Sequence, residues 1–321
     1  MPINRDKPDR WKEDIALSVD YYNNWFIGFA PKTYRKLRDE SIGHVKRVFS
    51  LIDNYRAINS EIILKDPSIL QTLRMSTCPP IARERLAGLA NVNNSVIVSL
   101  ESPEPQKSNK KRPSPSRIDN VAKICDVIIS MLDRDIFVWL DRTSEAKKTE
   151  IQRASTIVAD RLCSNLFGPQ FRTAQADRQM DRLRDWLMDN GYKRAHEVSF
   201  KDLQPGSFSL RMIVPIVMPN AYRRDEVGIQ VDVVIKPKGG DMSKLLLFIE
   251  AKSAGDYTNV NKRRKEEAQK ITQLRATYGH DTVYGLFLGG YFDTAYLGYE
   301  AAEGIDWIWE HRIDDIKQYG L

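Results

Sequence analysis

The chain has 321 residues, 42% of them hydrophobic, and an excess of Lys and Arg over Asp and Glu that gives a net charge of +6. This composition is typical of a globular protein with one large domain or two modest ones, and the positive charge favours a polyanionic partner, above all a nucleic acid. Apolar stretches such as residues 245–249 fall far short of the roughly 20 residues that span a bilayer. The charged N-terminus lacks the apolar segment of a secretory signal, so we expect a cytoplasmic protein.

Residues 1–101 are predicted to be mostly helical. Apolar residues recur at three- and four-residue spacing over residues 11–25 and 34–57, which predicts two helices. Residues 102–118 are rich in Pro, Ser and basic residues, which is typical of a linker or an exposed loop. We expect this segment to separate the N-terminal region from a second domain, residues 119–321.

The second domain is predicted to begin with helices and to continue with strands. Three helices are expected: residues 118–132, a helix capped by Ser144 that runs to about residue 162, and residues 171–189. From residue 206 onward, β-branched and aliphatic runs alternate with turn residues. They predict strands at residues 208–218, 228–237, 244–253, 283–290 and 305–311, with a helix at residues 262–278 and a short C-terminal helix. The order predicts an α/β (α+β) fold with a mixed central sheet flanked by helices.

An acidic residue followed two positions later by lysine occurs several times in the chain. The triplets that begin at Glu145 and Asp315 lie in polar, helix-like sequence, where a solvated charge pair is expected. Glu250 and Lys252 instead end the predicted strand LLLFIEAK, which is apolar on both faces. Because buried charges are costly unless they pair or bind an ion, this third triplet is the candidate functional one.

A predicted hairpin adds a second carboxylate to this triplet. The Gly-Gly-Asp segment at residues 239–241 predicts a turn, so the strands on either side of it should be antiparallel. If the hairpin is symmetric about residue 241, Asp232 lies opposite Glu250 with the two Cβ atoms about 5 Å apart. Lys252 shares their face, because side chains two residues apart in a strand point the same way.

This arrangement predicts a site for a divalent metal. Two carboxylates at such a distance repel unless a cation lies between them, and oxygen ligands favour Mg²⁺ or Mn²⁺ over zinc. Asp232 and Glu250, helped by the Ala251 carbonyl, are the candidate metal ligands, and Lys252 would orient a water nucleophile. The set suits phosphodiester hydrolysis, in which a metal activates water and neutralises developing charge. The alternative is a structural network of charges within the sheet.

A run of four cations follows the triplet, at the predicted start of the helix over residues 262–278. Positive charge is unfavourable at a helix N-terminus, but it becomes favourable if a phosphate backbone passes there. Lys262, Arg263, Arg264 and Lys265 are therefore candidate DNA-binding residues, with a solvated face balanced by the next two glutamates as the alternative. Other basic residues for which contact with nucleic acid and plain solvation both stay open are Arg83, Arg85, Arg223, Arg224 and the cations of residues 102–118.

Long runs of the sequence resemble the XamI family of type II restriction endonucleases. The resemblance rests on FIEAKSAGDYTNVNKRRKEEAQKITQLRATYG, on VDVVI before it, and on GYFDTAYLGYEAAEGIDWIWEHRIDD after it. CPPIARERLAGLA and STIVADRLCSNL are similar to blocks of the same family, so the resemblance covers most of the chain.

The resemblance implies a PD-(D/E)XK nuclease that uses Mg²⁺ to cut double-stranded DNA at a short, palindromic site. The motif residues fall on Asp232, Glu250 and Lys252, with Val231 in the place of the motif's proline. Many members of the superfamily add a carboxylate from a helix that precedes the sheet, for which Asp160 and Glu150 are both candidates.

A palindromic site further implies a homodimer. A restriction enzyme also implies a DNA methyltransferase as a functional, not physical, partner. The N-terminal region would contribute to DNA recognition. Two alternatives stay open: a repair or recombination nuclease with the same fold, and a DNA-binding protein without catalysis.

Overall fold

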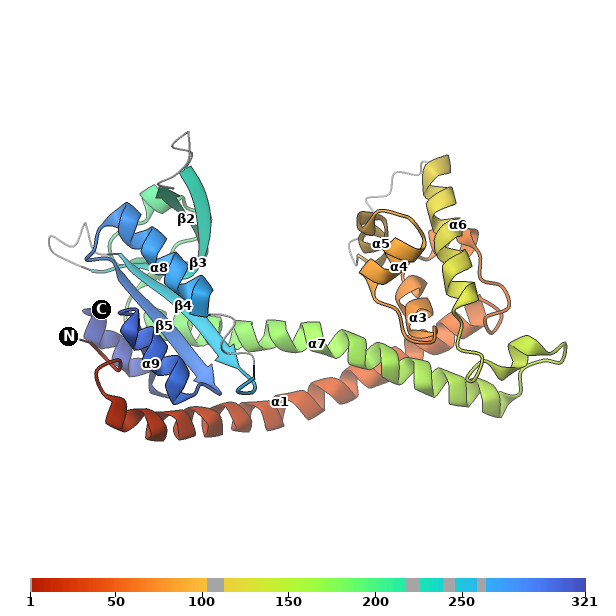
Figure 1. Cartoon of the computed structure of the whole chain (residues 1–321), viewed down its shortest axis with the longest axis horizontal. Coiled ribbons are helices and arrows are strands. Elements are labelled where there is room, and N and C mark those ends of the chain that lie inside the picture. The colour runs from red at the N-terminus through yellow and green to blue at the C-terminus, as the bar shows by residue number, and fades with distance from the viewer. Residues whose placement is uncertain (1, 103–112, 218–225, 239–245, 259–263) are drawn as a thin grey trace. The chain divides into compact units, whose positions relative to one another are not determined.

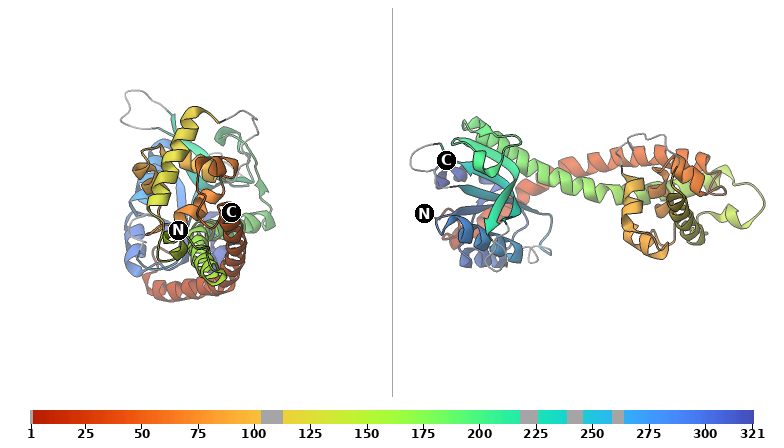
Figure 2. Two further views of the ribbon diagram at one scale, coloured as in Figure 1. Left: turned by 90° about the vertical axis from the view of Figure 1, so that its right-hand side faces the viewer. Right: turned by 90° about the horizontal axis from the view of Figure 1, so that it is seen from above.

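The computed structural model describes residues 2–102, 113–217, 226–238, 246–258 and 264–321. The chain forms two compact units, which are treated separately below (Figures 1 and 2). One unit combines residues 1–29 with residues 171–321, and the other consists of residues 30–170. Among the described residues, no helix combines the length and the hydropathy that crossing a bilayer requires.

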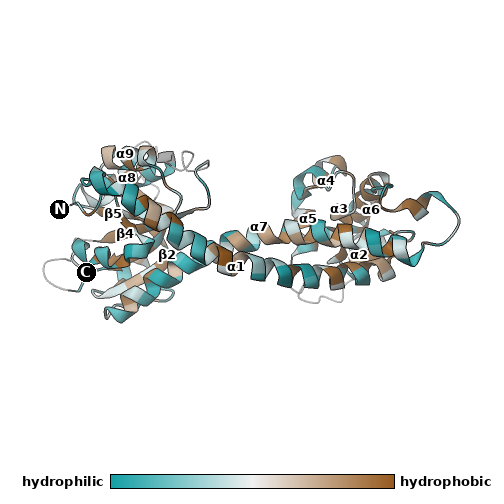
Figure 3. Cartoon of the chain, turned by 90° about the horizontal axis from the view of Figure 1, so that it is seen from below, coloured by the Kyte–Doolittle hydropathy of each residue, from teal (hydrophilic) through white to brown (hydrophobic). Residues whose placement is uncertain are grey.

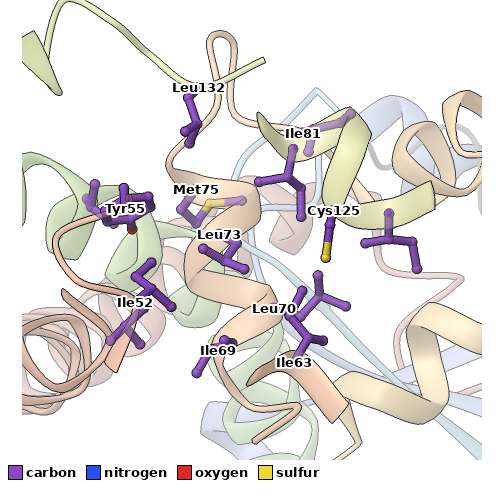
Figure 4. Close-up of a cluster of buried hydrophobic side chains, with 14 of the residues drawn as sticks. Ile52, Tyr55, Ile63, Ile69, Leu70, Leu73, Met75, Ile81, Cys125 and Leu132 are labelled. Atoms are coloured by element: carbon purple, nitrogen blue, oxygen red, sulfur yellow. The ribbon is translucent and has the colours of Figure 1, made fainter. Parts of the chain in front are cut away.

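The unit of residues 30–170 is helical. Its helices are the second half of α1 (Pro8–Leu51), α2 (Ser60–Lys65), α3 (Ile69–Met75), α4 (Arg83–Leu89), α5 (Asn94–Glu101), α6 (Pro115–Ser130), the 3₁₀ turn η1 (Val138–Asp141) and the first half of α7 (Lys148–Asp189). The short helix α3 lies within the core, where Leu70 and Leu73 are fully buried (Figure 4). The predicted helical character of the N-terminal region is therefore confirmed.

The other unit is built on a mixed sheet. Within the described residues, six strands pair in the order of the chain, with β2–β3 and β3–β4 antiparallel and the remaining neighbours parallel. The strands are β1 (Lys193–Arg194), β2 (Ser207–Val217), β3 (Glu226–Lys236), β4 (Leu247–Ala254), β5 (Val283–Gly290) and β6 (Asp306–Trp309). The helices between and after them are η2 (Phe200–Asp202), α8 (Arg264–Tyr278), α9 (Thr294–Ala302) and η5 (Glu310–Tyr319). The predicted α/β class is confirmed.

Helices cover both faces of this sheet. On one face, Ile271 and Leu274 of α8 and Leu297 of α9 pack on side chains such as Phe248 and Leu286. On the other face, α7 and η5 bury a second set that includes Leu183, Leu187, Ile313 and Ile316. Apolar and polar residues mix along α1 and α7 (Figure 3), so each helix buries one side only. Burial on both faces explains why the sequences of β4 and β5 are almost continuously apolar.

Two predicted helix boundaries and one predicted cap are wrong. The expected helix at residues 11–25 and most of the one expected at residues 34–57 are parts of α1, which runs through Pro31 and ends at Leu51, and two further expected helices are joined in α7, which runs through Pro169. Ser144 is not a helix cap, because α7 begins at Lys148. A proline removes one hydrogen bond from a helix interior without always ending the helix, because packing can offset the loss.

The predicted domain boundary at residues 102–118 also differs from the division in the structure. Residues 119–170, expected in the C-terminal domain, pack with residues 30–102 in the helical unit. The end of the expected linker begins a helix, since Ser114 caps α6 through the backbone N–H of Arg117. Residues 103–112 lie outside the described residues.

Candidate active site

The predicted hairpin is antiparallel and has the predicted register. Val233 pairs with Ile249 and Val234 with Phe248, so the next position along the same register brings Asp232 opposite Glu250. The backbone N–H of Ala251 donates a hydrogen bond of 3.0 Å to Oδ2 of Asp232. This bond fixes the Asp232 carboxylate against β4, next to Glu250.

Glu250 is a buried carboxylate that has both acidic and basic neighbours. Its residue is only 4% exposed. Burial raises the pKa of the Glu250 carboxyl, and the charge of Asp232 raises it further, against the opposing effect of Lys270 and Lys252. The strand thus holds a carboxylate in a place where cations are needed to keep it ionised.

Lys252 lies on the same face of β4 but does not form a close ion pair with Glu250. Its Nζ is 3.9 Å from Oε2 of Glu250 and 2.9 Å from Oε1 of Glu267, a residue of α8. Burial opposes the charged form of Lys252, but the carboxylates of Glu267 and Glu250 outweigh this effect and raise the pKa of the ammonium. Lys252 therefore stays cationic.

The structure adds two residues that the sequence analysis did not select, Glu267 and Lys270. Lys270 donates hydrogen bonds of 2.6 Å to Oε1 of Glu250 and 2.9 Å to the carbonyl of Gln230. A signal for Glu267 was present in the sequence, because it lies one turn before Ile271 on the apolar stripe of α8. A carboxylate on such a stripe is expected to be buried and paired.

A pocket of about 490 Å³ opens beside Asp232 and Ala251. It is lined in part by Arg172 and Gln175 of α7 and by Arg211 of β2. Arg211 has a left-handed backbone (φ 51°) at the position of β2 that faces Asp232 in the β2–β3 register. The Asp232 carboxylate is thus accessible from a pocket that also carries positive charge.

The structure does not describe the side chains of all candidate DNA-binding residues. Lys262 and Arg263 lie outside the described residues, as do Arg223 and Arg224; Arg264 and Lys265 begin α8, but their side chains are not among the described ones. Arg83 has a structural partner, since its Nε lies 2.5 Å from the carboxylate of Glu101.

Both candidates for an additional carboxylate, Glu150 and Asp160, lie in the unit of residues 30–170. There Glu150 pairs with Arg142, and Asp160 lies 3.7 Å from Arg38. The acidic side chain that the structure adds to the group around Lys252 is Glu267.

The carboxylate oxygens of Asp232 and Glu250 are ligands that suit Mg²⁺. Among the described residues, no three or more His, Cys, Asp or Glu side chains form a cluster that could hold a metal ion. Mg²⁺ does not need such a cluster, because it keeps several waters and commonly binds through one or two carboxylates. Asp232 and Glu250 supply two oxygen donors side by side, which meets this smaller requirement.

Comparisons with known proteins identify the family of the chain. The family model of the XamI restriction endonuclease matches residues 53–309. The Type II restriction enzyme SalI of Streptomyces albus G is 45% identical over 327 residues, which cover 99% of this chain and 99% of that enzyme. The crystal structure of protein VC1899 from Vibrio cholerae aligns with 12% identity and a TM-score of 0.28, over 88% of this chain and 55% of that one. That score is too low to support any inference.

The helix-flanked mixed sheet and these matches define the class of the protein, which is that of the site-specific restriction endonucleases. The chain belongs to the XamI restriction endonuclease family. The predicted resemblance is confirmed, and a DNA-binding protein without catalysis is excluded. The family membership also favours restriction over repair.

Proposed function

We propose that this endonuclease hydrolyses phosphodiester bonds of double-stranded DNA at a short palindromic site, with Mg²⁺ as its cofactor and Asp232, Glu250 and Lys252 as its catalytic residues. One observation carries the proposal: two carboxylates from neighbouring strands and an ammonium share one end of an otherwise apolar hairpin. The 45% identity to a type II enzyme supports assignment to that type.

Each of the three residues has a distinct proposed role. Asp232 and Glu250, with the carbonyl of Ala251, would hold the metal, which when bound supplies an activated water and positive charge for the developing phosphorane. The bond from Ala251 N–H orients Asp232. Lys252, whose raised pKa keeps it charged, orients the attacking water or contacts the scissile phosphate.

Binding of the duplex is assigned to positive charge around this site. Lys262, Arg263, Arg264 and Lys265 are proposed to contact the phosphate backbone, since they precede or begin α8, the helix that also carries Glu267. The helical unit of residues 30–170 is proposed to take part in DNA recognition.

A palindromic site is most simply bound by a two-fold symmetric homodimer, in which each subunit cuts one strand. We propose this state, together with a cytoplasmic location and a cognate DNA methyltransferase as a functional partner. The methyltransferase would protect the host's own copies of the site.

Digestion of a plasmid of known sequence tests the proposal. The protein with Mg²⁺ should give discrete fragments whose mapped ends share one sequence, and EDTA should abolish cleavage. Asp232→Ala and Lys252→Ala should each lose cleavage by at least about 10³-fold while still binding the site. Lys317→Ala, from another acidic-x-Lys triplet that lies on the surface, is the matched control and should cut normally. Nicking retained by both purified site variants would refute the assignment.

A further inference from the structure

Helix α8 places two charged residues against the two charged residues of β4, so that each helix residue meets one strand residue of opposite charge. Glu250 and Lys252 are two apart in β4, while Glu267 and Lys270 are three apart in α8, so each pair lies on one face of its element. Lys270 contacts Glu250 at 2.6 Å and Glu267 contacts Lys252 at 2.9 Å. The result is a row of alternating charges, two negative and two positive.

The distances show which partner holds Lys252. Within β4 alone, the ammonium would be drawn to Glu250, the carboxylate on its own strand face. Instead it lies 3.9 Å from Glu250 and 2.9 Å from Glu267. The Glu267 side chain is 1% exposed and the Lys252 side chain 17% exposed. A buried carboxylate at one end thus anchors an ammonium whose remaining N–H groups can point elsewhere.

We propose that Glu267 is a positioning residue for Lys252. Through this ion pair it keeps the Lys252 ammonium from closing onto Glu250 and leaves its N–H donors free to face the place where Asp232 and Glu250 meet. Glu267 itself touches neither DNA nor metal. This inference rests on the proposed function, since it gives Glu267 a role only if Lys252 takes part in cleavage.

The comparison of Glu267→Gln with the wild type tests the proposal. Gln keeps the shape and one oxygen acceptor but removes the charge that holds the ammonium. Single-turnover cleavage is expected to slow by about 10- to 100-fold, with DNA affinity unchanged within twofold. A purely structural role would instead lower the melting temperature and leave the rate of the folded enzyme unchanged, which would overturn the proposal.

A double-mutant cycle shows whether Glu267 acts through Lys252. If it does, Glu267→Gln should slow the wild type but add nothing in the Lys252→Ala background, where no ammonium remains to be positioned. An equal slowing in both backgrounds would contradict the proposal. Cleavage retained by Asp232→Ala in the same assay would instead refute the proposed active site, so the two failures are distinguishable.

Two further variants keep the test independent of folding. Glu267→Asp keeps the charge but is one methylene shorter, so it should fold and still slow cleavage about tenfold by displacing the ammonium; a wild-type rate would overturn the proposal. Asp14→Asn is the structural control, because Asp14 is a buried carboxylate of the same unit that pairs with Arg312 at 2.7 Å. It should lower stability without changing the single-turnover rate.

Discussion

Several buried charged residues of this protein have a partner of opposite charge. Arg178 pairs with Glu310 and Arg312 with Asp14, in both cases with a carboxylate that is almost fully buried. The helical unit follows the same rule, since Glu101 is 1% exposed and binds both Arg74 and Arg83. Removing one partner from such a group costs far more than the pair contributes, because it leaves a charge without compensation in a poor solvent.

Glu101→Gln should therefore destabilise the helical unit strongly. The Arg74 side chain is 3% exposed and would lose its only anionic partner among the described residues, so we expect a loss of about 3 to 5 kcal/mol in the free energy of unfolding. Urea denaturation of the two proteins measures the difference. Glu40→Gln is the control, because Glu40 pairs with Lys36 on the surface, and it should unfold like the wild type. Equal unfolding midpoints for both variants would contradict the argument.

At the residue scale, the sequence was informative where periodicity and turn chemistry acted together. Asp232, Glu250 and Lys252 could be brought to one face because a strand repeats every two residues and the register was predicted from a turn expected at residues 239–241. Glu267 and Lys270 could not be placed in the same way. Their contacts with Lys252 and Glu250 depend on how α8 packs on the sheet. This packing is part of the tertiary structure, and no local sequence pattern predicts it.

At the scale of elements, the hydrophobic pattern predicted the type and order of the helices and strands better than it predicted their lengths. The predicted strands are present, with β4, β5 and β6 buried almost throughout and β2 exposing alternate residues toward its end. Helix α9, a nine-residue element, was not predicted, and α1 and α7 were each predicted as two shorter helices, although each continues through a proline, Pro31 or Pro169. Packing along a long helix can offset one missing hydrogen bond, and the sequence alone does not reveal that packing.

The end of β5 depends on a glycine. Gly290 has φ 94°, and a Cβ built on it would lie 2.1 Å from the carbonyl oxygen of Ala254 in β4. Its N–H also donates to the hydroxyl of Ser18 in α1, at 2.9 Å. Gly290→Ala combines backbone strain with a clash against backbone atoms, so it should cost about 2 to 5 kcal/mol in the free energy of unfolding.

Gly28→Ala is the matched substitution for this prediction, and its expected sign is opposite. Gly28 lies inside α1 with nothing within 4 Å of the added Cβ, and alanine is the better helix former. We expect a gain of about 0.5 to 1 kcal/mol. Thermal and urea unfolding of the two variants measure both effects, and a stable Gly290→Ala protein would show that the strands can move apart at this point.

For the whole molecule, composition indicated the class of partner but not the arrangement of the chain. The net charge of +6 favoured nucleic acid from the start, in agreement with the family to which the chain belongs. The domain boundary was predicted wrongly because residues 119–170 bury their apolar side chains against helices from the N-terminal half. Contacts between segments that are distant in the sequence cannot be predicted from the local amino-acid composition.

Positive charge should also govern how DNA affinity depends on salt. Each phosphate that a cation neutralises releases counterions, so the slope of log K against log salt grows by about 0.9 per contact. Changing Lys262, Arg263, Arg264 and Lys265 together to Ala should make the slope shallower by about 3 to 4 if all four contact phosphates. Fluorescence anisotropy with a fixed duplex, in the Asp232→Ala background to prevent cleavage, measures this slope.

The charge-matched control separates specific phosphate contacts from a general effect of net charge. Lys193, Arg194, Lys201 and Lys317 are exposed cations of the same unit, and their joint change to Ala removes the same four charges. Because only cations within reach of the backbone displace counterions, this control should lower the slope by less than about one. Equal slopes for the two variants would mean that the cations at the start of α8 have no special place on the DNA, and that affinity follows net charge alone.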